Sequence, residues 1–232
     1  VSKIGAQFPG NVSELSTKNI TDILANSCLE PDLIHLTGSM YAIAYRDNSS
    51  TSVTTFQMND DGVFLGTIDT KIIPVPHFYE PTIINIQNNI YAIAYGASDD
   101  QTEAKSHIVT LPLYGNGTIG EIIDTFDFPA YYGREPNFMN VGAGIYAVAI
   151  GGSSIETFPT GYLVTLSIDN LGNIGPALID TLKFPLSSSC SEPSIVHITG
   201  DMYTITYNGF GITAGNGYVI TVHILNNGSI VE

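Results

Sequence analysis

A short apolar run, Tyr-Ala-Ile-Ala-Tyr, recurs four times with few changes in this chain of 232 residues. The copies read MYAIAYR from residue 40, IYAIAYG from 90, IYAVAIG from 145 and MYTITYN from 202. Successive side chains of a β-strand point to opposite faces, so each copy carries bulky residues on one face and Ala or Thr on the other. Neither face is charged. The pattern therefore indicates strands that are buried on both sides, which a single sheet cannot provide.

Each run belongs to a longer repeat that opens on a Glu-Pro pair, at Glu30, Glu80, Glu135 and Glu192. Further runs rich in Ile, Val and Thr come before and after the Tyr-Ala run, and such runs bounded by Gly, Asn or Pro are typical of strands. The third run always leads into a turn containing glycine, which tolerates the positive φ of tight hairpins. These glycines are Gly62, Gly117, Gly172 and Gly228. Each repeat is thus predicted to be a four-stranded antiparallel meander.

Repetition of a sheet that is apolar on both faces predicts a ring of sheets stacked face to face, which is a β-propeller. The Tyr and Ile side chains of one sheet are expected to fill the hollow over the Ala residues of the next. The predicted fold is all-β, with residues 1–232 forming a single four-bladed β-propeller domain. The expected blades cover about residues 30–75, 80–129, 135–185 and 192–232.

The fourth repeat ends before its fourth strand, which raises the question of how the ring closes. The N-terminal stretch KNITDIL resembles the fourth-strand runs IIDTF and LIDTL, so a strand at about residues 18–25 is predicted to complete blade 4 and close the ring. Cys28 and Cys190 stand at equivalent places, two residues before a Glu-Pro pair, and are predicted to form a disulfide across the closure. Two buried thiols are the alternative. A larger ring made from two chains, or an open filament, are further alternatives.

The combination of IYAIAY, LVTL, IIDTF or LIDTL, and Glu-Pro at these distances resembles tandem repeats of secreted and surface-layer-associated proteins of archaea and some bacteria. The resemblance extends over about residues 28–232. It implies a β-propeller-like module for which no activity is defined. Such modules are sometimes attached to carbohydrate-binding domains, so other surface proteins or glycans are the expected partners.

The composition excludes some partners. The formal net charge is −15, with only seven Lys and Arg residues, so the chain lacks the basic surface that nucleic acids require. No apolar run approaches the roughly 18 residues that cross a bilayer, and direct membrane insertion is not expected. Five Asn-x-Ser/Thr sequences are candidate glycosylation sites: Asn11, Asn19, Asn48, Asn116 and Asn227. With the acidity and the repeats, they predict an extracellular or cell-surface location.

The repeated acids are candidates for a binding site. If the strand after each Glu-Pro pair is the innermost, then Glu30, Glu80, Glu135 and Glu192 gather at one mouth of the ring axis. Calcium suits such a set of carboxylates, because it prefers several hard oxygen ligands. Alternatively, each carboxylate accepts a hydrogen bond from the backbone of a neighbouring blade. A second set, Asp69, Asp124 and Asp180, is expected on outer strands, where charge protects an exposed sheet edge.

Signatures of enzymes are absent from the sequence: it contains no Gly-x-Ser-x-Gly elbow, no His-Glu-x-x-His and no P-loop. Tyr131, Tyr132 and Arg134, in a connection between blades, suit stacking on a sugar or contact with a protein. The sequence therefore predicts a non-enzymatic adhesion or assembly module. A carbohydrate-binding or glycan-hydrolysing propeller is the first alternative, since glycosidases assemble their two carboxylates from distant strands. A self-associating subunit of a surface sheath or filament is the second.

Overall fold

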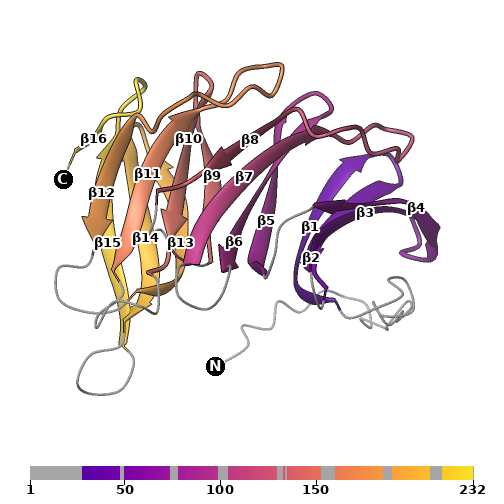
Figure 1. Ribbon diagram of the computed structural model, residues 1–232, viewed down its shortest axis with the longest axis horizontal. Helices are drawn as coiled ribbons and strands as arrows, with labels where there is room; N and C mark the ends of the chain where they lie inside the picture. The colour runs from indigo at the N-terminus through magenta and orange to yellow at the C-terminus, as the bar shows by residue number, and fades with distance from the viewer. Residues whose placement is uncertain are drawn as a thin grey trace, which may run out of the picture.

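The computed structural model describes residues 28–47, 50–73, 78–98, 104–129, 133, 135–152, 160–184, 190–209 and 216–231 (Figure 1). Within these ranges the chain forms sixteen β-strands arranged in four separate sheets of four strands. The same ranges contain no helix long and apolar enough to cross a membrane.

The strands of every sheet follow one another in chain order and pair antiparallel, so the predicted meanders are confirmed. Blade 1 consists of β1 (Leu29–Thr37), β2 (Met40–Arg46), β3 (Thr51–Met58) and β4 (Phe64–Ile73). Blade 2 consists of β5 (Phe78–Gln87), β6 (Ile90–Ser98), β7 (Ala104–Pro112) and β8 (Asp124–Asp127). Blade 3 consists of β9 (Asn137–Gly142), β10 (Ile145–Ile150), β11 (Gly161–Ser167) and β12 (Asp180–Phe184). Blade 4 consists of β13 (Ser191–Thr199), β14 (Met202–Gly209), β15 (Asn216–Ile224) and β16 (Ile230–Val231).

The Tyr-Ala runs form the second strand of each blade and pack between neighbouring sheets. One apolar cluster joins Tyr91, Ile93 and Tyr95 of β6 to Ala42 and Ala44 of β2. The same arrangement recurs twice: residues of β10 pack against Ala92 and Ala94, and residues of β14 pack against Ala147 and Ala149. The bulky faces of blades 2, 3 and 4 thus each fill the small-residue face of the preceding blade, as the alternation of side chains predicted.

A hydroxyl group on the third strand of each preceding blade adds a polar contact to each interface. Thr110 Oγ1 donates to the carbonyl oxygen of Gly172 at 2.6 Å, and both residues are buried. Gly172 has a φ of 90°, which a side chain rarely adopts, and a Cβ there would lie 3.0 Å from Ile90 and Ile123. Glycine therefore lets the hairpin approach the preceding sheet. Thr55 and Thr165 make the equivalent hydrogen bonds to Gly117 and Gly228.

The acids of the fourth strands also connect blades. Asp124 Oδ2 accepts a hydrogen bond from the backbone N–H of Ile174 in the next blade at 2.8 Å. Asp69 and Asp180 do the same with Ile119 and Ile230. The prediction that these acids protect an exposed sheet edge missed this role, because each one binds the hairpin of the following blade.

Replacing Thr110 by valine is expected to lower the free energy of unfolding by about 1–3 kcal/mol, because the isosteric side chain leaves the buried carbonyl of Gly172 without its donor. Urea denaturation measures this change. Thr221 occupies the same place on β15 but is exposed, so Thr221→Val should change stability by no more than about 0.5 kcal/mol. Equal losses at both positions would contradict a role for the hydroxyl in holding blades together.

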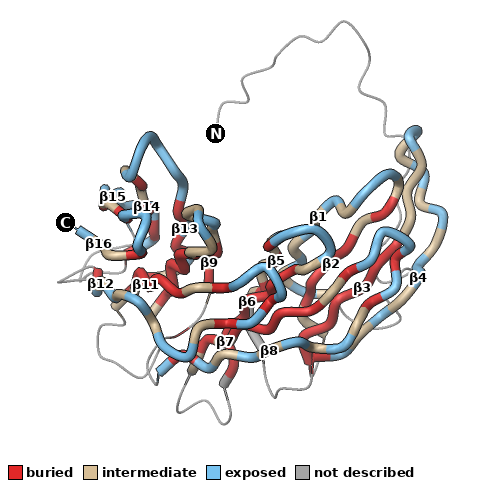
Figure 2. The backbone as a smooth tube through the Cα atoms, turned by 90° about the horizontal axis from the view of Figure 1, so that it is seen from above, coloured by how far each residue is buried: buried red, intermediate tan, exposed pale blue. Residues whose placement is uncertain are grey.

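The four blades form an open arc, with blades 1 and 4 at its two ends (Figure 2). The apolar cluster around Ile43, Tyr45 and Phe56 on the bulky face of blade 1 contains no described residue of another blade. The ring closure predicted from the sequence is therefore not formed by the described residues. The proposed closing strand at about residues 18–25 lies outside them.

The predicted disulfide is wrong, since both cysteines are free thiols. Cys28 packs beside the cluster of blade 1, whereas Cys190 is buried between blades 3 and 4. Cys190 fills space above a glycine: a Cβ on Gly161 would lie 2.6 Å from its Sγ. Because Cys28 belongs to blade 1 and Cys190 lies at blade 4, the two thiols stand at opposite ends of the open arc.

Candidate functional site

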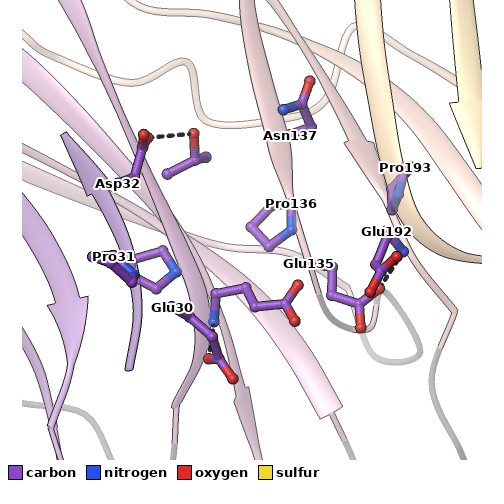
Figure 3. Close-up of a pocket in the computed structure, with 11 residues that line it drawn as sticks. Glu30, Pro31, Asp32, Glu135, Pro136, Asn137, Glu192 and Pro193 are labelled. Carbon is purple, nitrogen blue, oxygen red and sulfur yellow. Dashed lines mark hydrogen bonds between the residues drawn. The ribbon is translucent and has the colours of Figure 1, made fainter. Parts of the chain in front are cut away.

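The four Glu-Pro pairs meet in one pocket of about 430 Å³ (Figure 3). Three of the pairs stand within β1, β5 and β13, and the pair of blade 3 comes directly before β9. These first strands contact one another in the order β1, β5, β9, β13. The pocket is lined by Glu30, Pro31, Asp32, Glu80, Pro81, Thr82, Glu135, Pro136, Asn137, Glu192 and Pro193. The prediction that the four glutamates gather at one mouth is consistent with this lining.

Each glutamate has a backbone conformation that is rare for a residue with a side chain. The φ angles of Glu30, Glu80, Glu135 and Glu192 are 51°, 45°, 60° and 49°. The pairing register shifts at the Glu-Pro pair in β1, β5 and β13, which marks a β-bulge. Proline has no N–H to give to the ladder, so a bulge is a favourable place for it. Bulges redirect side chains, and here they accompany glutamates that line the pocket.

Two of the carboxylates hold the backbone of the following blade. Glu30 Oε2 accepts a hydrogen bond from the N–H of Glu80 at 2.8 Å. Glu135 Oε2 accepts one from the N–H of Glu192, and Figure 3 shows these two residues side by side. The expectation of a backbone hydrogen bond is therefore confirmed for Glu30 and Glu135.

A polar residue two positions after the glutamate repeats this contact. Asp32 Oδ2 accepts from the N–H of Ile83 at 2.8 Å, and Asn137 Oδ1 accepts from the N–H of Ile195 at 3.0 Å. Sequence analysis missed these residues. The signal was present, because this position is polar in every repeat: Asp32, Thr82, Asn137 and Ser194.

The glutamates at the two ends of the arc have partners within their own blades. Glu30 Oε1 lies 3.2 Å from the guanidinium of Arg46. Glu192 Oε2 accepts a hydrogen bond of 2.6 Å from the amide of Asn208. Arg46 and Asn208 both follow the Tyr-Ala run directly, at a place where blades 2 and 3 have glycine.

Glu80 differs from the other three in its acidity. Partial burial raises the pKa of its carboxyl group, and the negative charges of Glu135, Glu30 and Glu192 raise it further, to about 7. The positive charge of Arg46 opposes this shift only in part. Near neutral pH the pocket therefore holds a carboxyl group that can donate a proton or a hydrogen bond, next to carboxylates that can accept one.

Glu80→Gln is expected to stabilise the protein at about pH 8 by about 1 kcal/mol, a small value because the half-exposed carboxyl is screened by solvent. The folded pKa lies above the ordinary 4.5, so the folded protein keeps a proton that the unfolded chain loses between these values. The stability that the wild-type protein gains from this bound proton is complete below about pH 4.5 and is lost as the pH rises through about 7. Urea denaturation of the wild type and of Glu80→Gln should therefore give equal stabilities at about pH 4.5 and a more stable variant at about pH 8. Glu121→Gln, at an exposed residue outside the pocket, is the control, because it removes a carboxylate that makes only a surface ion pair with Lys71.

The described ranges contain no group of three or more His, Cys, Asp or Glu residues placed to hold a metal ion. Glu30, Glu80, Glu135 and Glu192 line one pocket, but hydrogen bonds and an ion pair already occupy oxygens of three of them. The calcium site remains a prediction from the sequence.

The other predicted site residues are only partly described. Tyr131, Tyr132 and Arg134 lie outside the described residues, as do Asn11, Asn19 and Asn48. Asn116 and Asn227 are exposed at equivalent hairpins of blades 2 and 4. Their Oδ1 atoms accept hydrogen bonds of 3.0 Å from the N–H groups of Thr118 and Ser229, so both candidate glycosylation sites are accessible and share one geometry.

Comparison with known proteins gives no match to a family model and none to a curated protein. Solved structures do match. The GH93 α-L-arabinofuranosidase of Fusarium graminearum in complex with arabinobiose is 10% identical, with a TM-score of 0.54 over 88% of this chain. The endo-arabinase of Bacteroides thetaiotaomicron is 14% identical, with a TM-score of 0.55 over 88% of this chain.

The α-L-arabinofuranosidase of Lactobacillus brevis is 10% identical, with a TM-score of 0.52 over 88% of this chain. This chain spans 62% of the Fusarium structure, 71% of the Lactobacillus structure and 79% of the Bacteroides structure. At such low identity the matches bear on the fold alone. Together with the four stacked meanders, they show that the chain has a β-propeller fold.

Proposed function

We propose that this β-propeller binds a glycan in the pocket of the four Glu-Pro pairs. The main support is the mixed chemistry around Glu80, whose raised pKa of about 7 keeps its carboxyl group partly protonated near neutral pH, beside the negative charges of Glu135, Glu30 and Glu192. Sugar hydroxyls both donate and accept hydrogen bonds, so they suit a pocket that offers both kinds of group. The side chains of Asp32, Thr82 and Asn137 add further polar groups to its wall.

The structural matches support arabinose-containing oligosaccharides as the first ligands to try. Their names describe two α-L-arabinofuranosidases and an endo-arabinase, one of them in complex with arabinobiose. The surface adhesion module predicted from the sequence fits within this proposal, as a propeller that recognises glycans without altering them. The accessible sequons at Asn116 and Asn227 support a location outside the cell.

Hydrolysis of the bound glycan is a second candidate, favoured by the pKa of about 7 at Glu80. In this function the Glu80 carboxyl gives its proton to the glycosidic oxygen as that bond breaks. A neighbouring carboxylate such as Glu135 then either activates water or attacks the sugar, and the separation of the two carboxyl groups decides which.

Calorimetric titration with arabino-oligosaccharides tests the binding proposal. The wild type and Glu121→Gln should bind with the same affinity, whereas Glu80→Ala should bind about tenfold or more weakly because a buried polar contact is lost. Absence of saturable binding to these sugars and to a broad glycan array would refute the proposal.

Release of reducing sugar from arabinan separates the two candidates. A hydrolase should lose about 100-fold or more of its rate in Glu80→Gln, because the general acid is gone, while binding persists. Binding by the wild type without any release identifies a recognition module.

A further inference from the structure

The first strands that surround the pocket are not joined in the same way at every junction between neighbouring blades. At the junction of blades 1 and 2, Glu30 accepts a hydrogen bond from the N–H of Glu80 at 2.8 Å. Asp32 accepts a second one, also of 2.8 Å, from the N–H of Ile83 further along β5. Two side chains of blade 1 thus bind the backbone of blade 2 at the edge of the pocket.

The junction of blades 3 and 4 repeats this pair of hydrogen bonds. Glu135 accepts from the N–H of Glu192. Asn137 accepts from the N–H of Ile195 at 3.0 Å. These residues occupy the same places in the repeat as their counterparts at the first junction. Both junctions are therefore joined by two side chains that reach the backbone of the following blade.

The junction of blades 2 and 3 has no such pair within the described part of the chain. The Glu80 carboxyl group makes no hydrogen bond to a described residue. Thr82 stands where blades 1 and 3 have Asp32 and Asn137, and its hydroxyl donates back to Asp32 at 3.1 Å. The threonine oxygen is attached directly to Cβ, so it reaches less far than a carboxylate or amide oxygen. Neither side chain of blade 2 therefore binds the backbone of blade 3.

One backbone donor of blade 3 is left without an acceptor as a result. Phe138 has the place in the repeat of Ile83 and Ile195. It pairs with β10 in the register in which Ile195 pairs with β14, so its N–H points away from β10 and towards the neighbouring β5. No described residue accepts a hydrogen bond from this N–H, although Phe138 is only 6% exposed. An unpaired N–H in a buried residue costs free energy, so this junction favours a ligand that supplies an acceptor.

We infer that the glycan binds at the junction of blades 2 and 3, where it accepts a hydrogen bond from the N–H of Phe138 and contacts the side chains of Glu80 and Thr82. This inference rests on the proposed function, because it places the ligand inside the pocket which that function requires. Glu80 and Thr82 line the pocket from blade 2, and Phe138 directly follows Asn137, which lines it from blade 3. A sugar suits this place because one hydroxyl accepts from the N–H while a second donates to the carboxyl group. The ligand thereby bridges blades 2 and 3 as side chains bridge the other junctions.

The substitution Thr82→Asn gives blade 2 the side chain that blade 3 has at this place. Its amide oxygen should accept from the N–H of Phe138, as Asn137 does from Ile195, and raise the midpoint of thermal unfolding by about 2–4 °C. It should also weaken the binding of arabino-oligosaccharides about tenfold or more in calorimetric titration, because it takes the hydrogen bond of the ligand. Thr125→Asn, the same substitution at an exposed threonine of β8, should change neither value.

Hydrogen exchange of the backbone amides examines the junction in the unmodified protein. Without sugar, the amide of Phe138 should exchange about tenfold or more faster than the amides of Ile83 and Ile195, which side chains of the preceding blades bind. Saturating arabino-oligosaccharide should slow the Phe138 amide by a similar factor and leave the other two unchanged.

The outcomes separate this inference from the proposed function. Equal exchange of the three amides without sugar, or a Thr82→Asn variant that is no more stable than the wild type, would overturn the inference. Full affinity of a stabilised Thr82→Asn variant would also overturn it but leave the proposed function intact, because the sugar would then bind elsewhere in the pocket. A wild type that binds no sugar would overturn both.

Discussion

Replacing Ile93 by alanine is expected to lower the free energy of unfolding by about 2–5 kcal/mol. Ile93 is fully buried at the centre of β6 and belongs to the cluster that joins blade 2 to the alanines of blade 1. Its loss removes apolar burial and leaves a cavity between two sheets that cannot easily collapse, since each is held by its own strand ladder. Urea denaturation followed by circular dichroism measures the change.

The matched control is the same substitution at Ile198, which is 52% exposed on the open face of blade 4. Ile198→Ala should cost no more than about 1 kcal/mol because little burial is lost. A small loss at Ile93 would contradict burial between sheets. A large loss at Ile198 would show that the fourth blade is covered in the monomer.

Adding bulk to the small-residue face should also lower stability, because it overfills the interface instead of leaving a cavity. Ala94→Leu is expected to cost about 1–3 kcal/mol, because the hollow over Ala94 is already filled by side chains of blade 3. Thr206 is the counterpart of Ala94 on the open face of blade 4 and is exposed, so Thr206→Leu should change the stability of the monomer by about 0.5 kcal/mol or less. Equal penalties at the two sites would show that blade position does not matter.

The sheets and their order could be predicted from the sequence because the information is local. Alternation in the Tyr-Ala runs defines two faces, and the turn glycines define the hairpins. The contact of Tyr91 and Ile93 with Ala42 and Ala44 then follows, since no other surface suits either face. Ring closure depends instead on the angle between sheets, which is set by the combined packing of many side chains. The same limit explains the wrong disulfide, because equivalence of Cys28 and Cys190 in the repeat does not fix the distance between them.

The candidate site was predictable to the same extent. Repetition of Glu-Pro on the inner strand placed four carboxylates in one pocket, but it made them look equivalent. What distinguishes Glu30 and Glu192 from Glu80 and Glu135 is outside the repeat: Arg46 pairs with Glu30 and Asn208 with Glu192, at positions that are glycine in blades 2 and 3. The raised pKa of Glu80 further depends on its burial and on its distance from three other charges, which a sequence does not contain.

The most direct test of the stacked-blade account is a double-mutant cycle between Ala94 on β6 and Val148 on β10, which share one cluster across two sheets. Val148→Ala makes room where Ala94→Leu adds bulk. The double variant should therefore lose at least about 0.5 kcal/mol less than the sum of the two single losses. Strictly additive losses would mean that the two faces do not touch, and would contradict the stacking of bulky face on small-residue face.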